Sequence, residues 1–559
     1  MKRIGKNSGI PSINNINQNR TMITNRFLKT LALPVAVALG MFTASCSNDD
    51  NILDEQQPSA AKYEIPVTVS ATRSGDDAST RAVYDSGTRK LTFEEGDQLF
   101  IQGTDATAGT FAGLLSNTAG APGTFSGTLT TTNEYTGTFE ALFTSATTLT
   151  ATLLPKDYST NGNGYLTLSG EGASQTLTVD ATKAFVTAAS ADAAKKLAIE
   201  QLSLEQATAY STGFALAPVN AVLNYSIAAN SLSAGTHTMF VHNGNGLSIS
   251  GSITAVTDAA TTFAVALPAD ASTSRNYSLC TLGYNDIVKT GKALTEGKVF
   301  NISATASENA NAPLPGAFTV GDGKQVRFAK GNLTYSTSSP NWSFLSNSWD
   351  YNTSPSAYGK SNGSQHFDWG TVFKSGTSGE SDLLDEMTTN TNLGSGWSGL
   401  SRAQWRYLLG YDGQNSGTQS SKRTVSWHHY AKITSTATIG TGNKRYLLIF
   451  PDDFQESDWN TTSMGATPTA FDGTSESSAE YTADNFTAMQ AVGIVILPAA
   501  GCHLSSYWHY VGDCGYYWSS TSSDASNAYI LSFGSNFVDM SNYTKPSYYF
   551  PVRLVQNLN

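Results

Sequence analysis

Cysteine and histidine, the side chains best suited to redox chemistry, metal binding and proton transfer, cluster near the C-terminal end of this chain. Cys502 and Cys514 lie twelve residues apart, with two of the seven histidines between them. A disulfide that closed so short a loop would stabilise the fold by about 3 kcal/mol in the chain-entropy model. In an oxidising compartment we expect this bridge, and two free thiols are the alternative. Cys280 lies in an apolar strand pattern and is expected to be buried.

The segment between these two cysteines carries four consecutive residues with rings. Trp and Tyr offer a large contact area at a low entropic cost. A loop that presents them could stack on sugar rings or grip a protein surface. The alternative is that Trp508 and Tyr510 fill the core of their own domain. The predicted ligand-binding residues are Tyr507, Trp508, His509 and Tyr510.

Other patterns give little support for catalysis or metal binding. A Gly-x-Ser-x-Gly match at 359–363 lacks the strand and helix that frame a nucleophile elbow. His428 and His429 are adjacent, so on regular structure they point in different directions. No HExxH, P-loop or EF-hand pattern occurs. We therefore expect no catalytic residue, no metal and no other cofactor. A solvated acidic loop is expected, with calcium binding as the alternative, at Asp452, Asp453 and Asp458.

Composition indicates an extracellular β-protein of several domains. The chain has 559 residues, only 14% of them charged, with 49 Gly and a net charge of −11. This length exceeds a single domain. The acidic balance provides no electrostatic footprint for nucleic acid. All nine Trp lie beyond residue 341, which separates the last part of the chain from the rest.

The first residues have the pattern of a bacterial lipoprotein signal. The apolar run 31–42 is too short to span a bilayer but matches a signal-peptide core. Small residues before Cys46 resemble a lipobox, which implies cleavage there and lipidation of Cys46; a soluble secreted protein is the alternative. Met22 is a second candidate start codon. We expect a signal peptide at 1–45, a flexible tether at 46–62, and a surface-exposed lipoprotein anchored in the outer membrane.

Residues 63–305 alternate apolar and polar positions, with turn residues about every ten positions, which is typical of β-sandwiches. Several motifs resemble the fimbrillin-type pilins of Bacteroidetes: the strand 63–71, Thr-Arg-Ala at 80–82, the segment 91–102 and the segment 143–158. The resemblance implies two tandem transthyretin-like β-sandwiches, which we place at 63–190 and 191–305.

The same resemblance implies polymerisation with other pilin subunits by donor-strand exchange, after a protease cuts behind an arginine near the first strand. Arg73 and Arg81 bracket a polar loop and are the candidate cleavage sites, with Arg81 favoured. Removal of one strand would expose two ladder edges and an apolar slot that a neighbour's strand can fill. The alternative is that both are ordinary surface arginines.

A linker at 306–315 precedes a third domain at 316–559. Its clearest element is a helix at 400–410, where Ser401 and Gln404 form a capping box and Leu400 and Trp405 occupy the positions of a hydrophobic staple. An ordered set of motifs resembles the major paralogous domain of bacterial surface proteins, which is related to the C-type-lectin-like and formylglycine-generating-enzyme-like fold. They are 331–333, 397–400 with Trp405, 497–501, 517–521 and 552–555.

This resemblance implies an α+β domain that recognises a ligand, in which the last strand returns beside the first. In the enzyme relatives two close cysteines bind copper, but the spacing here departs from theirs. The chain is thus predicted to be a mainly β, non-catalytic fimbrial tip or minor pilin adhesin that binds a glycan or surface protein. The alternatives are a glycan-capturing lipoprotein of a polysaccharide-uptake system and a formylglycine-generating-type enzyme.

Overall fold

The chain divides into two compact units, Met1–Ala61 and Lys62–Asn559. The computed structural model describes most of the second unit: residues 63–73, 93, 95–156, 158, 164–187, 197, 199–203, 213–273, 275–291, 293–296, 299–339, 341–351, 357–374, 379–389, 393–410, 423–435, 444–473, 475–479, 481–504 and 506–558. The signal peptide, Cys46, the tether and Arg81 lie outside these residues. No helix in the described part is long and apolar enough to cross a membrane.

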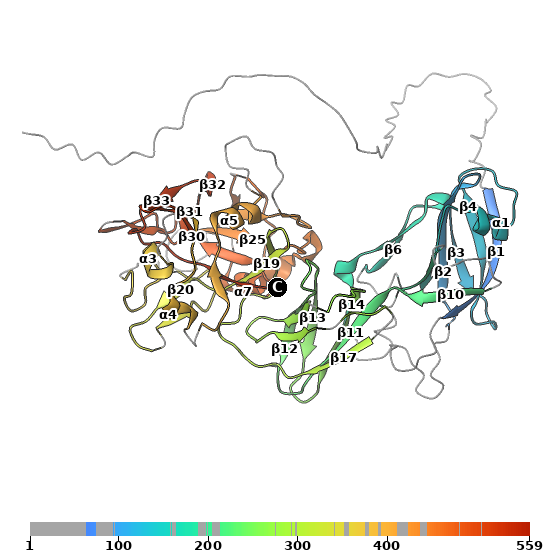
Figure 1. Ribbon diagram of the computed structural model, residues 1–559, viewed down its shortest axis with the longest axis horizontal. Helices are drawn as coiled ribbons and strands as arrows, with labels where there is room; N and C mark the ends of the chain where they lie inside the picture. Colours follow the sequence, from blue (N-terminus) through green and yellow to red (C-terminus); the bar gives the residue numbers. More distant parts are fainter. Residues whose placement is uncertain are drawn as a thin grey trace, which may run out of the picture. The chain divides into compact units, whose positions relative to one another are not determined.

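Seven strands near the N-terminal end form one sheet that closes into a barrel. Its core is aliphatic and aromatic, and the buried residues of α1 (Phe139–Ser145) pack into it. In Figure 1 the blue and cyan strands lie side by side, with α1 beside β1. In the order of the sheet the strands are β1 (Tyr63–Arg73), β10 (Gly213–Pro218), β9 (Glu200–Ser203), β5 (Thr148–Leu154), β2 (Gln98–Asp105), β3 (Gly109–Asn117) and β4 (Thr124–Thr131).

Two four-stranded sheets follow and enclose a second core. The first sheet has the order β17 (Val299–Ala304), β11 (Asn220–Ile227), β14 (Thr261–Pro268), β8 (Phe185–Val186). The second has the order β13 (Ser248–Ala255), β12 (Gly235–His242), β15 (Asn276–Cys280), β16 (Ile287–Thr290). A hairpin of β6 (Leu166–Ser169) and β7 (Thr176–Val179), with the 3-10 turns η1 (Gly172–Ser174) and η2 (Ala181–Lys183), precedes them.

Strand pairing does not follow the expected division at residue 190. β8 precedes that boundary but pairs with β14 of the second core, whereas β9 and β10 follow it and return to the first barrel. The first domain is also a closed barrel and not a pair of separate sheets. The physical reason is that β10 lies parallel to β1 and satisfies an edge that an open sandwich would leave unpaired.

The remaining chain, here called the head domain (316–558), mixes small sheets with short helices. The opening hairpin β18 (Phe318–Gly321) and β19 (Lys324–Phe328) pairs with the terminal strand β34 (Leu554–Asn557), which in turn pairs with β23 (Trp397–Gly399). The last strand thus lies beside the first hairpin, as expected.

Two larger sheets complete the head domain. One contains β22 (Gly379–Glu380), β30 (Gly515–Asp524), β31 (Asn527–Gly534), β32 (Phe537–Asp539) and β33 (Tyr543–Thr544). The other contains β26 (Ser477–Ser478), β24 (Tyr430–Ser435), β25 (Lys444–Ile449) and β27 (Val495–Pro498). Two hairpins are β20 (Leu333–Tyr335) with β21 (Trp342–Phe344), and β28 (Cys502–Leu504) with β29 (Tyr507–His509).

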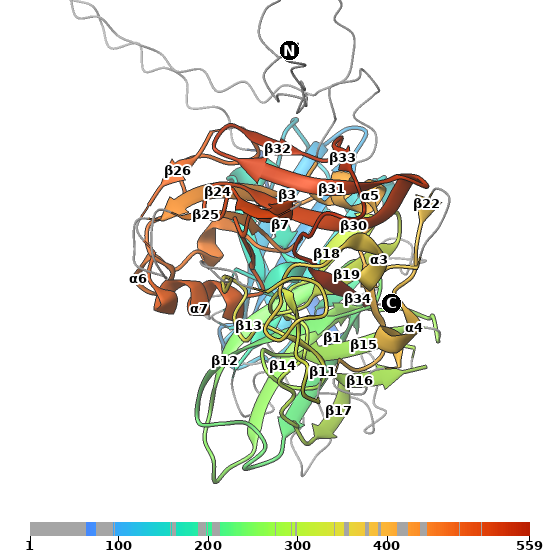
Figure 2. The same ribbon diagram turned by 90° about the vertical axis from the view of Figure 1, so that its left-hand side faces the viewer.

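Local capping signals define the helices of the head domain. The helix predicted at 400–410 is confirmed as α5 (Arg402–Leu408), where Ser401 and Gln404 form the capping box and Trp405 is fully buried. Figure 2 shows β30 and β31 side by side, with α5 against them. The other helices are α3 (Trp369–Val372), α4 (Asp385–Thr388), α6 (Thr461–Met464), α7 (Ala483–Ala491) and the 3-10 turn η3 (Glu456–Asp458).

Candidate functional site

The four predicted ligand residues lie on and just after the short hairpin β28–β29. Cys502 pairs with His509, and Leu504 pairs with Tyr507. Gly501 begins the hairpin at a φ of 66°, where a Cβ atom would lie 2.4 Å from the His509 carbonyl oxygen. Tyr510 follows the hairpin at a φ of 59°, a backbone conformation that residues with a Cβ atom rarely adopt. These two left-handed residues mark the two ends of the hairpin.

The hairpin presents two of its rings to solvent. Tyr507 is 71% exposed and Tyr510 is 49% exposed, whereas Trp508 and His509 are half-buried. The structure therefore places Tyr510 on the surface and not in the core. Trp508 lies between these alternatives, because one side of its ring contacts His366 and His503, each with ring centroids 4.8 Å away.

Residues from distant parts of the chain extend this surface. Tyr358 is 40% exposed and stacks on His503 with ring centroids 4.0 Å apart. Tyr549 lies 4.6 Å from Tyr358, and its backbone exchanges two hydrogen bonds with His503. We call the residues Tyr358, His503, Tyr507, Trp508, Tyr510 and Tyr549 the aromatic surface. Sequence reasoning missed Tyr358 and Tyr549, since no local pattern links them to the hairpin.

The aromatic surface is electrically neutral at neutral pH. Burial lowers the pKa of His366 to about 4. Burial and the neighbouring His509 also lower the pKa of His503, and burial raises the pKa of Tyr549. Neutral rings with hydroxyl and imidazole edges can stack on a ligand and exchange hydrogen bonds with it, but they offer no charge to an ionic ligand.

Cys502 and Cys514 carry free thiols in the structure. Burial raises the pKa of Cys502 to about 12, and burial also raises the pKa of Cys514. Raised pKa values favour the protonated thiol, which is a poor nucleophile and a poor metal ligand. The expected bridge is not formed here and stays a prediction for the oxidised protein. Cys280 is buried, as expected.

The serine of the Gly-x-Ser-x-Gly match lies in a turn. Gly359 and Gly363 have φ values of 60° and 77°, and the Ser361 carbonyl oxygen accepts a hydrogen bond from the Ser364 amide. The segment precedes α3, and none of the described residues between β21 and this match is in a strand, so they do not provide the frame of a nucleophile elbow. Gly359, the first residue of the match, forms a turn directly after Tyr358, which lies in the aromatic surface.

Adjacent His428 and His429 contact one carboxylate, and the Nδ1 atom of the His429 ring lies 3.6 Å from it. His428 approaches Asp472 through Nδ1 at 3.2 Å, whereas His429 donates its backbone amide to the same carboxylate at 2.9 Å. The His428 ring stacks on Phe471 with centroids 3.9 Å apart. Within the described ranges no group of three or more His, Cys, Asp or Glu side chains could hold a metal ion.

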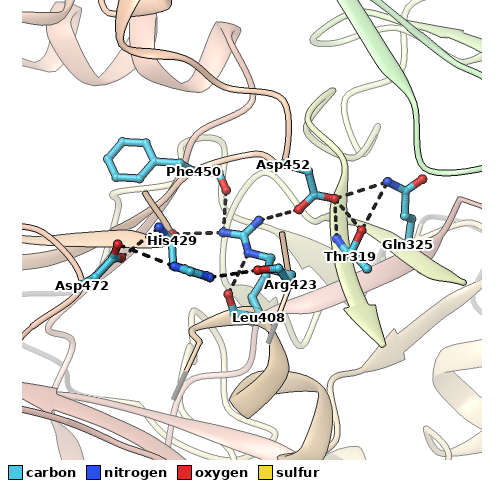
Figure 3. A network of polar contacts seen from close by, with 8 residues as sticks. All are labelled: Thr319, Gln325, Leu408, Arg423, His429, Phe450, Asp452 and Asp472. Carbon is cyan, nitrogen blue, oxygen red and sulfur yellow. Dashed lines mark hydrogen bonds and ion pairs between the residues drawn. The ribbon is translucent and has the colours of Figure 1, made fainter. Parts of the chain in front are cut away.

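The acidic loop is partly buried and not the solvated loop expected from the sequence. Asp452 pairs with Arg423 at 2.8 Å and accepts hydrogen bonds from Thr319 and Gln325. Figure 3 shows the Arg423 guanidinium between Asp452 and the backbone oxygens of His429 and Phe450. Asp458 caps its own turn, and burial raises the pKa of Asp453 to about 7. Both carboxylate oxygens of Asp452 are thus bonded to protein donors.

Strand β1 is the second candidate site, because assembly by strand exchange would act there. It pairs antiparallel with β4 from Tyr63 to Ser70 and parallel with β10 from Ser70 to Arg73. Alternate side chains face the barrel core, and each is at most 6% exposed: Ile65, Val67, Val69 and Ala71. The strand predicted at 63–71 is confirmed. A cut after Arg73 or Arg81 would leave all of β1 on the released peptide.

Comparison with known proteins gives distant similarity. The family described as "Domain of unknown function (DUF8237)" matches residues 474–555, and no curated protein matches the chain. A candidate cell adhesion protein of Bacteroides ovatus is 12% identical with a TM-score of 0.23, covering 44% of this chain and 97% of its own. The tip fimbrial protein Mfa3 of Porphyromonas gingivalis is 9% identical with a TM-score of 0.18, covering 42% and 85%. TM-scores of this size do not define a shared fold.

Proposed function

We propose that this chain is a non-catalytic surface lipoprotein of the bacterial outer membrane, acting as a fimbrial tip or minor pilin adhesin. In this proposal Cys46 carries the lipid anchor. The β-rich domains join other pilin subunits by donor-strand exchange, and the head domain binds a glycan or protein on a host or bacterial surface through Tyr507, Trp508, His509 and Tyr510. We keep the domain ranges expected from the sequence, except that β8 is assigned to the second β-domain and β9 and β10 to the first.

The observation that carries this proposal is the position of β1. It holds two strand edges together and fills the barrel core with four side chains, yet it is the first strand of the described chain. Its removal would expose the edges of β4 and β10 and an apolar slot between them, which a strand of another subunit can occupy.

The N-terminus of the protein from the cell surface tests the maturation step. N-terminal sequencing is expected to find chains that begin at residue 74 or residue 82. An Arg73→Ala, Arg81→Ala double variant should keep β1 and stay monomeric, whereas Arg275→Ala, at an arginine distant from β1, should mature normally. Surface polymers that retain residues 63–73 would contradict strand exchange.

The runner-up is a glycan-capturing lipoprotein of a polysaccharide-uptake system, which would not polymerise; a formylglycine-generating-type enzyme is the third candidate. The neutral aromatic surface suits the runner-up equally, so co-purification with pili separates the first two. Copper retention together with thiol oxidation would favour the enzyme.

A further inference from the structure

A polar cleft of about 530 Å³ lies in the head domain apart from the aromatic surface, with which it shares no residue. Its walls come from β22, β23, the turn before β19, the start of α5 and the end of β34. A volume of this size falls in the range of small-molecule sites.

The cleft lies between the outer strands of two sheets, which are joined at one end by Ser520. β22 ends one sheet and β23 ends another. Both segments meet at Ser520 on β30: the Ser381 amide donates to the Ser520 carbonyl oxygen, and the Ser520 amide donates to the Leu400 carbonyl oxygen, each at 2.9 Å. Gly399 permits this close approach, because a Cβ there would lie 2.5 Å from the Phe373 ring and 3.3 Å from Ser520. Ser520 therefore lies at the point where the edges meet, and it lines the cleft.

Several polar side chains of the lining make no side-chain hydrogen bond within the described part of the chain. Ser520 is only 4% exposed, and in the described part of the chain no protein group bonds to its hydroxyl. The same holds for further cleft side chains, which offer both donors and acceptors. The side chains without such a hydrogen bond are Glu380, Ser381, Asp382, Ser398, Ser520 and Asn557, and the Asp382 carboxylate interacts electrostatically with Lys374.

The chemistry of the lining selects one class of ligand. The lining carries both signs of charge, Lys324 and Lys374 beside Glu380 and Asp382. Lys374 is already paired with Asp385 at 2.9 Å. An anion or a cation would therefore meet a like charge in the cleft. An apolar ligand would contact little, since Leu383 and Trp397 are the large apolar residues among those that line the cleft. A neutral ligand with many hydroxyl groups suits it, because each hydroxyl both donates and accepts a hydrogen bond.

We propose that this cleft binds a neutral oligosaccharide. Carboxylates of Glu380 and Asp382 accept from sugar hydroxyls, and the hydroxyls of Ser381, Ser398 and Ser520 exchange hydrogen bonds with the same ligand. The head domain then has two recognition surfaces, the aromatic surface and this cleft. The cleft site stands without strand exchange, so either proposal can fail alone.

An array of neutral oligosaccharides, probed with the full mature chain, tests the proposal. At least one is expected to bind, and titration of that oligosaccharide measures the effect of each variant. Ser398→Tyr, which fills the cleft, and Asp382→Asn, which removes an acceptor, should each weaken binding about tenfold or more. Ser535→Tyr places the same ring in an exposed turn of the head domain, and its affinity should stay within about twofold.

Two results would overturn the proposal. One is that no neutral oligosaccharide binds, or that an array of short peptides binds in their place. The other is that Ser398→Tyr and Asp382→Asn leave the affinity unchanged while Tyr507→Ala abolishes it, which would assign the sugar to the aromatic surface. Thermal unfolding of each variant shows that the head domain is folded; if Ser398→Tyr unfolds it, Asp382→Asn decides.

Discussion

Val67→Ala tests both the packing of β1 and its fate in assembly. Val67 is 3% exposed and lies opposite Gly127 on β4. Val67→Ala removes two methyl groups, and the loss of each from the core costs about 0.8 kcal/mol. The cavity left behind adds to this cost. We therefore expect the free energy of opening β1 to fall by about 2 kcal/mol. Thr68 is exposed on the same strand, and Thr68→Ala should cost no more than about 0.5 kcal/mol.

Hydrogen exchange measures this difference locally. Amides of β4 that bond to β1 should exchange about thirtyfold faster in Val67→Ala, since 1.4 kcal/mol corresponds to about tenfold. The Thr68→Ala control should exchange as the unchanged protein does. Equal exchange in the two variants would refute the placement of Val67 in the barrel core.

The same pair of variants then tests strand exchange. If cleavage removes β1 before assembly, polymers of Val67→Ala and of the unchanged protein contain the same residues and dissociate at the same denaturant concentration. Mass spectrometry should find no peptide from residues 63–73 in them. Polymers that keep this peptide, and that Val67→Ala weakens, would refute the proposed exchange.

Three further predictions concern the head domain. Tyr507→Ala should weaken cell adhesion about tenfold or more in a plate assay, whereas Tyr543→Ala, at an exposed tyrosine outside the aromatic surface, should not. Arg423→Met leaves the Asp452 carboxylate unpaired and should lower the unfolding free energy in urea by about 3–5 kcal/mol; Lys360→Met, at an exposed pair, should change it by less than about 1 kcal/mol. Burial lowers the pKa of His366 to about 4 in the folded protein, below its ordinary value. The stability that the neutral ring contributes to the fold is therefore full above about pH 6.5 and is lost as the pH falls toward 4. His366→Gln should flatten that part of the curve of unfolding free energy against pH, measured by urea unfolding.

Local patterns predicted local structure well. The alternation at 63–71 predicted β1, and the Ser401–Gln404 capping box predicted α5, because each signal is contained within a few neighbouring residues. Barrel closure was not predictable in this way. The parallel pairing of Ser70 with Gly213 joins positions far apart in sequence, and nothing local to either strand specifies that partner.

The functional surfaces show the same limit. The run Tyr507–Tyr510 was visible as a motif, but the stacking of Tyr358 on His503 depends on a turn that returns from elsewhere in the chain. The polar cleft was not predicted either. Its lining consists mostly of ordinary polar and charged residues from separate parts of the chain, which come together only where two sheets meet near Ser520.

Buried arginines explain how a head domain with short strands and many loops can hold such surfaces in place. Arg553 bonds to backbone oxygens of Ala329, Ser348 and Ile496, and Arg423 bonds to those of Leu408, His429 and Phe450. Some of these carbonyl groups lie in loops or at the end of a helix, as Leu408 does at the end of α5, where no regular backbone partner follows. Burying a carbonyl group without a hydrogen-bond partner is costly. A guanidinium offers five donors in a fixed plane, so one side chain can satisfy carbonyl groups from several separate segments at once.

This arrangement gives a physical reason for the motif at 552–555. Arg553, on the segment leading into β34, ties the chain just after β19 to β27 itself, through the carbonyl oxygens of Ala329 and Ile496. β34 in turn pairs with β19 and β23. The cleft wall at β23 is therefore fixed by the terminal strand, which Arg553 anchors. Rigid support of this kind lowers the entropy that a bound ligand must offset, and it favours recognition by preformed surfaces over recognition by loops that order on binding.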